Sequence, residues 1–183
     1  MSSDINYGPL TPLIGTWQGD GGMDVAPEDD GPRHSPYYET IVFEAAGDVD
    51  NADTQELVIV RYHQVVSRKK NDKVFHNESG YWMWDQAADT IIQTLTIPRG
   101  LSLVAGGTYS QLEGGVRFEV SAAKDNADFG IVEAPFLQQN ASTSRFVRTL
   151  TVQGDQLSYQ QTTFLNIYGG PFEHTDENVL KRV

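Results

Sequence analysis

Histidines are the side chains in this sequence with the best chemistry for binding a metal ion. The chain has four of them, His34, His63, His76 and His174, and it has no cysteine. The lack of cysteine excludes disulfide bonds, thiol chemistry and thiolate ligands to a metal. An imidazole binds a metal through one ring nitrogen while a second group orients the other nitrogen. These four rings are therefore the first candidates for a metal ligand.

Two of the histidines have settings that weaken their candidacy. His34 lies in the segment from Met23 to Pro36, whose three prolines and several acids predict an irregular loop. His63 shares a strand face with Arg61. If that face points inward, the pair could bind a carboxylate; if it points outward, both side chains are solvated.

Common catalytic motifs are missing from the sequence. It contains no G-x-S-x-G nucleophile elbow, no H-E-x-x-H zinc motif, no P-loop and no G-x-G-x-x-G between a strand and a helix. Carboxylates are numerous, but no pair stands where a β register would specify an acid and a base. The sequence by itself therefore predicts no reaction.

Short strands separated by tight turns account for most of the chain. Ten segments are rich in β-branched and aromatic residues: 16–21, 39–44, 56–67, 74–84, 90–97, 103–109, 116–120, 145–152, 157–167 and 178–183. Such spacing indicates a sandwich or a barrel. The stretch 57–60 is apolar on both faces, which favours a small barrel with an apolar lumen. We predict an all-β fold, a closed antiparallel barrel of about ten strands in one domain spanning residues 1–183.

Two segments outside the strands could cover the ends of such a barrel. Residues 10–14 predict a short helical turn that leads into the first strand. Residues 129–141 contain several apolar side chains and predict a short helix or an apolar loop folded over the barrel mouth.

Charge and hydropathy restrict the location and the partners of the protein. The first six residues lack the positive and apolar regions of a signal peptide, and no window approaches the ~18 apolar residues of a membrane-spanning helix. We therefore expect a cytoplasmic protein. The net charge of −12 argues against nucleic acid and anionic membranes as partners.

The motif G-x-W-x-G-x-G at the start of the first strand is the most informative stretch. It comprises Gly15, Trp17, Gly19 and Gly21. A large indole there can plug the closed end of a barrel, and the glycines allow close approach of neighbouring backbone. A basic side chain from the last strand, Lys181 or Arg182, could lie across the indole as a cation–π contact.

An all-β chain of this size that opens with this motif resembles the nitrobindin family. These proteins are ten-stranded calycin barrels related in shape to fatty-acid-binding proteins and lipocalins. Further similarity follows in the same order along the chain, in Tyr37–Glu44, in the H-x-E-x-G-Y strand Phe75–Tyr81, at Gly100 and in Lys181–Val183.

The resemblance implies a function and a cofactor. The family holds ferric haem b in the barrel mouth on one axial histidine, and it is associated with nitric oxide binding and peroxynitrite isomerisation. His174 lies just before the predicted last strand, as that ligand does. An ungapped alignment of the chain ends instead puts Thr175 at the axial position, and a shift of one residue reverses the face of a strand. His174 is therefore either the iron ligand or a structural residue held by Asp176 or Glu173.

The same alignment places other residues around the pocket. His76 matches a histidine on the side opposite the axial ligand, and Phe75, Ile97 and Leu165 match lining positions. A second hypothesis is a binding module for another apolar ligand, such as a fatty acid, with Arg61 or Arg99 on its carboxylate. The sequence leaves open whether two copies of the chain form a homodimer.

Overall fold

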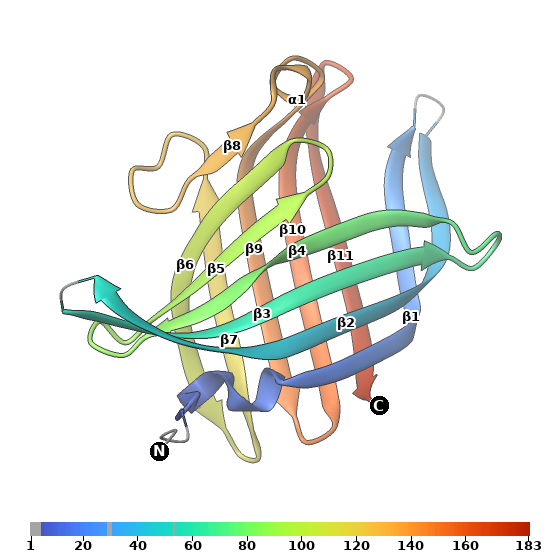
Figure 1. The fold of residues 1–183 in the computed structure, drawn as a ribbon. Coiled ribbons are helices and arrows are strands. Elements are labelled where there is room, and N and C mark those ends of the chain that lie inside the picture. The colour runs from blue at the N-terminus through green and yellow to red at the C-terminus, as the bar shows by residue number, and fades with distance from the viewer. Residues whose placement is uncertain (1–4, 29–30, 53) are drawn as a thin grey trace.

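A ring of antiparallel strands forms the body of the protein (Figure 1). The computed structural model describes residues 5–28, 31–52 and 54–183. These residues form the strands β1 (Gly15–Glu28), β2 (Gly31–Ala52), β3 (Gln55–Arg68), β4 (Val74–Asp85), β5 (Thr90–Ile97), β6 (Leu101–Leu112), β7 (Gly115–Ala123), β8 (Ile131–Glu133), β9 (Ala141–Gln153), β10 (Gln156–Ile167) and β11 (Gly170–Arg182). They also form a 3₁₀ helix, η1 (Gly8–Leu13), and an α-helix, α1 (Pro135–Asn140).

The ring closes because its first and last strands pair. β11 runs antiparallel to β1, with Arg182 opposite Trp17, and pairing between β5 and β6 completes the circle. β8 pairs with β6 beside the ten strands of the ring. The predicted closed antiparallel barrel of about ten strands is confirmed, and so is the short helical turn before the first strand.

Helix η1 and the first strand seal one end of the barrel, where the C-terminus also lies (Figure 1). Leu10, Leu13 and Trp17 are fully buried there. The indole Nε1 of Trp17 donates a hydrogen bond to the carbonyl of Leu13 at 2.7 Å. The guanidinium of Arg182 lies 4.1 Å from the centre of the Trp17 ring and donates to the carbonyl of Pro12 at 2.8 Å. The motif at the start of β1 thus ties the helix to the last strand.

The segment from Met23 to Pro36 is a strand hairpin, so the prediction of an irregular loop is wrong. Met23 pairs with Pro36, and the ladder continues to Glu28 opposite Gly31. The prolines are accommodated because each strand of a two-stranded arm needs hydrogen bonds along one edge only, and proline is tolerated at the other edge. β2 is also longer than the predicted segment 39–44 at its other end, where it continues to Ala52 beside β3.

The strand register divides the barrel interior into layers. Along β11 the inward side chains are, in order from the closed end, Leu180, Asn178, Asp176 and His174. In β2, β3, β4, β9 and β10, apolar side chains at the closed end are likewise followed by a buried polar residue, and together these form a layer, whereas the buried residues of β6 and β7 are apolar. This polar layer consists of Glu39, Gln64, Glu78, Arg148, Tyr159 and Asn178. Beyond it the interior opens.

Strand β8 and helix α1 lie at the open end of the barrel (Figure 1). The segment 129–141 was expected to be a short helix or an apolar loop over the mouth, and it contains both a strand and a helix. Leu137 of α1 packs against the core, whereas Phe136 is 72 % exposed. No helix among the described residues is long and apolar enough to cross a membrane.

Candidate functional site

The open half of the barrel contains a cavity of about 370 Å³. Small-molecule sites commonly have volumes of about 300–1,000 Å³. Most of the wall is aliphatic or aromatic and consists of Leu95, Ile97, Leu101, Leu103, Leu137, Phe146, Leu165 and Ile167. A smaller pocket of about 240 Å³ adjoins the cavity, and the two share His76, Arg99, Gln161, His174 and Asp176. Ile97 and Leu165 thus line the cavity, whereas Phe75 lines the smaller pocket.

His174 faces the interior from β11, between two carboxylates. Its Nε2 lies 3.3 Å from Oδ1 of Asp24, and its Nδ1 lies 3.5 Å from Oδ2 of Asp176. The hydrogen bond with Asp24 raises the pKa of His174 against the effect of burial, and the charge of Asp176 adds to the rise. Burial in turn raises the pKa of Asp176. A ring held at both nitrogens has a fixed orientation.

The neighbouring Thr175 points away from the cavity. Its hydroxyl lies 3.1 Å from that of Thr162 on the outer face of β10, in a ladder without a register shift. Alternation along β11 therefore leaves His174, and not Thr175, on the inner face. The ungapped alignment of the chain ends, which puts Thr175 at the axial position, therefore selects a side chain that points away from the cavity.

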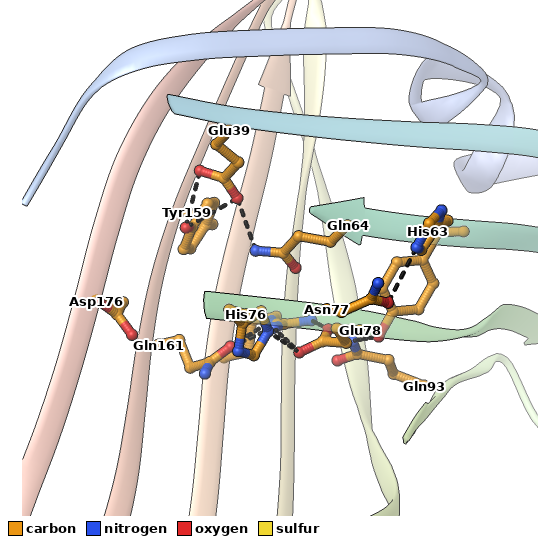
Figure 2. A network of polar contacts seen from close by, with 12 residues as sticks. Glu39, His63, Gln64, His76, Asn77, Glu78, Gln93, Tyr159, Gln161 and Asp176 are labelled. Carbon is orange, nitrogen blue, oxygen red and sulfur yellow. Dashed lines mark hydrogen bonds and ion pairs between the residues drawn. The ribbon is translucent and has the colours of Figure 1, made fainter. Parts of the chain in front are cut away.

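His76 reaches the same region from β4. Its Nε2 lies 3.2 Å from Oε2 of Glu78, two residues further along the strand on the same face. The adjacent Phe75 is covered by the guanidinium of Arg68, 4.3 Å from the ring centre. Figure 2 shows His76 and Glu78 close together, with Gln161 nearby. Both pocket histidines therefore have a carboxylate partner.

A buried ion pair forms part of the floor of the cavity. Arg148 donates from Nη1 to Oε1 of Glu78 at 2.9 Å, and the two side chains are only 4 % and 1 % exposed. Tyr62 donates to the same carboxylate at 2.6 Å, and Arg148 also donates to Gln161 at 2.9 Å. Burial by itself would raise the pKa of Glu78, but the charges of Arg148 and His76 and their hydrogen bonds lower it to about 2. Glu78 is therefore ionised at neutral pH.

A second buried carboxylate, Glu39, lies in the same polar layer. It accepts hydrogen bonds from Gln64 at 2.6 Å and from the Tyr159 hydroxyl at 3.0 Å (Figure 2). Asn178 donates a third, at 2.6 Å. Burial raises the pKa of Glu39, and these three donors counteract the rise. Burial also raises the pKa of Tyr159 well above its usual value.

The remaining histidines lie outside the cavity. His63 contacts Oδ1 of Asn77 at 3.0 Å on the outer surface, and Arg61 pairs with Glu44 at 2.7 Å. The alternative in which His63 and Arg61 point inward and bind the carboxylate of a ligand is wrong, because alternation along β3 turns both side chains outward. His34 is exposed on the β1–β2 hairpin opposite Val25.

Sequence reasoning missed Arg148, Glu39 and Asp24. Arg148 alternates with Phe146 and Leu150 on the inward face of β9, so a charge at an inward register position was a readable signal. Asp24 carried no such signal, because it contacts His174 across 150 residues of sequence and only the closure of the barrel brings them together.

Comparison with known proteins identifies the kind of barrel. A family model described as a THAP4-like, heme-binding beta-barrel domain matches residues 6–182. The chain belongs to this family. A crystal structure of Rv2717c from M. tuberculosis is similar to it, with a TM-score of 0.71 and 25 % sequence identity over 95 % of this chain and 94 % of that chain.

The site of this THAP4-like barrel has the features that haem requires. A porphyrin needs apolar walls, and the cavity supplies them from β5, β6, β9 and β10. Haem iron needs an imidazole whose other nitrogen is held, and His174 has a carboxylate at each nitrogen. To bind iron, the ring must give up one of these contacts and keep the other. The residues therefore fit a haem group.

Proposed function

We propose that this barrel binds one haem b in the cavity, in the ferric state, with His174 as the iron ligand. The observation that carries the proposal is the position of His174, an inward imidazole at the edge of an aliphatic cavity with a carboxylate beside each ring nitrogen. A carboxylate that stays on one ring nitrogen orients the ring and makes the other nitrogen a stronger donor to iron.

Nitric oxide binding and peroxynitrite isomerisation are the functions that we assign to the loaded protein. The bound haem would supply an iron position at which either small molecule could coordinate. His76 is held by Glu78 at the cavity wall, where its ring could donate a hydrogen bond to such a ligand. Arg99 lines both the cavity and the smaller pocket, and its guanidinium could pair with a haem propionate.

Titration of the purified apo-protein with hemin tests the proposal. The visible absorption band of hemin should shift and saturate at one equivalent. The shift should disappear in His174→Ala and persist in Thr175→Ala, a matched control from the outer face of the same strand.

Two outcomes contradict different parts of the proposal. A wild-type spectrum like that of free hemin would contradict haem binding as a whole. If His76→Ala abolished the shift and His174→Ala did not, the haem site would stand but the ligand assignment would be wrong.

A second candidate function is a carrier for another apolar ligand with a carboxylate, such as a fatty acid. It is favoured by the two contacts that already occupy both ring nitrogens of His174, and by Arg99 at the edge of the cavity. A fluorescent fatty acid should then bind at one equivalent while hemin does not, and Arg99→Gln should weaken its binding. Displacement of that probe by hemin would instead place both ligands in one cavity.

A further inference from the structure

Three side chains that can bind a metal ion meet in the smaller pocket. Asp24 comes from β1, whereas His174 and Asp176 alternate on the inner face of β11. Each residue offers one ligand atom, and these three atoms all lie within 4.8 Å of one another. Two ligands of a tetrahedral ion are about 3.4 Å apart when each is about 2.1 Å from the metal. The distance of 3.3 Å between His174 Nε2 and Asp24 Oδ1 already meets this condition. Asp176 now contacts the other ring nitrogen, Nδ1, and its carboxylate must turn toward the ion to become the third ligand.

The direct contacts of the two carboxylates also favour a cation. The side chain of Asp24 is 8 % exposed and that of Asp176 is 21 % exposed. Among the described residues, His174 is the only cationic group within 4.0 Å of either carboxylate. Arg68, His76 and Arg99 also line this pocket but form no ion pair with Asp24 or Asp176, so the imidazole is shared between the two carboxylates. A carboxylate without a direct cationic partner in a poorly solvated site is costly. A divalent cation would neutralise both.

We propose that Asp24, His174 and Asp176 bind one first-row divalent cation of the zinc type. Two carboxylate oxygens and one imidazole nitrogen suit such ions, whereas calcium and magnesium prefer oxygen ligands alone. Three protein ligands leave a coordination position open, and the pocket of about 240 Å³ has room for water or a small ligand there.

The cation and haem iron compete for the same imidazole. This consequence rests on the proposed function, because it requires His174 to be the iron ligand, but the cation site itself does not. A divalent ion in the pocket should therefore weaken hemin binding, and saturation with hemin should release the ion.

Metal titration of the chelator-treated protein tests the site. Zinc binding by calorimetry and the visible spectrum of bound cobalt(II) should both saturate at one equivalent. Asp24→Asn should weaken zinc binding by more than about 100-fold. Asp20→Asn, which changes an exposed carboxylate of the same strand, should bind like the wild type. Asparagine has the size of Asp24 and keeps a hydrogen bond to His174. If the Asp24 carboxylate had only a structural role, Asp24→Asn would therefore leave zinc binding nearly unchanged.

Parallel hemin titrations separate this inference from the proposed function. Asp24→Asn should lose zinc with a much smaller loss of hemin affinity, because Asp176 can still hold the other ring nitrogen of His174, whereas His174→Ala should lose both. If Asp24→Asn does not fold, Asp176→Asn serves in its place, with the outward Glu177→Gln as control. Zinc binding by Asp24→Asn or Asp176→Asn with wild-type affinity, or no stoichiometric zinc binding by the wild type, would overturn the cation site. Zinc binding without hemin binding would overturn only the proposed function.

Discussion

Glu78 and Glu39 lie in one polar layer, yet their surroundings shift their pKa values in opposite directions. Arg148 and His76 lower the pKa of Glu78 to about 2. Burial raises the pKa of Glu39, and the neutral donors around it only partly offset that rise. Removing one partner of a buried ion pair leaves the other charge uncompensated. Removing the charge of Glu39 leaves no such charge in direct contact.

We predict that Glu78→Gln lowers the free energy of unfolding at pH 7 by about 3–5 kcal/mol, because Arg148 then remains buried without its counter-charge. Glu39→Gln, a matched change in the same layer, should lower the free energy of unfolding by less than about 2 kcal/mol, the range of one lost hydrogen bond. Chemical denaturation followed by tryptophan fluorescence measures both. Equal losses for the two variants would show that the Glu78–Arg148 pair has no special role.

The same pair predicts the response of stability to acid. The folded-state pKa of Glu78 lies below its usual value of 4.5, so its stabilising effect is complete above about pH 4.5 and is lost as the pH falls toward 2. The difference in unfolding free energy between the wild type and Glu78→Gln should therefore narrow across that interval. A difference independent of pH would contradict this assignment.

At the scale of single residues, the sequence predicted residues of the cavity wall but not the buried ion pair of its floor. His76, His174, Ile97 and Leu165 were proposed as pocket residues from the family resemblance, and all four side chains line the cavity. The ion pair between Glu78 and Arg148 joins strands 70 residues apart, and nothing local to either residue specifies that pairing. Local patterns show which face a residue occupies, but not its partner across a barrel.

At the scale of elements, β1, β11 and η1 form one connected unit at the closed end. Arg182 lies across Trp17 and donates to the carbonyls of Pro12 and Ile14. The last residues of the chain thereby hold the first helix against the barrel. The cavity lies at the other end, where Leu137 of α1 forms part of its wall.

We predict that Arg182→Met lowers the free energy of unfolding by about 1–3 kcal/mol, since it removes a cation–π contact and two hydrogen bonds. Lys181→Met, on the outer face of the same strand, should change it by less than about 0.5 kcal/mol. Hemin affinity should be the same in both variants because the change lies far from the cavity. Weaker hemin binding in Arg182→Met alone would indicate that the two ends of the barrel are coupled.

Element boundaries show where sequence patterns fail. All ten predicted strands are present, because alternation and turn residues are local signals. The hairpin arm of β1 and β2 was missed, since its prolines resemble loop residues and its stability comes from pairing between two strands. Asp24, on that arm, was missed with it.

At the scale of the whole molecule, the barrel is only half hollow. Large side chains such as Trp17, Trp82 and Phe118 fill the closed end, and the polar layer separates them from the cavity. A ligand can therefore enter only the open half, where His76 and His174 lie.

The crystal structure of the hemin-loaded protein is the most direct test of the central claim. We expect a porphyrin between the aliphatic side chains of β5, β6 and β10, with a ring nitrogen of His174 bound to iron at about 2 Å, a typical metal–imidazole distance. A porphyrin bound elsewhere, or one in the cavity with His174 still in contact with both Asp24 and Asp176, would contradict it.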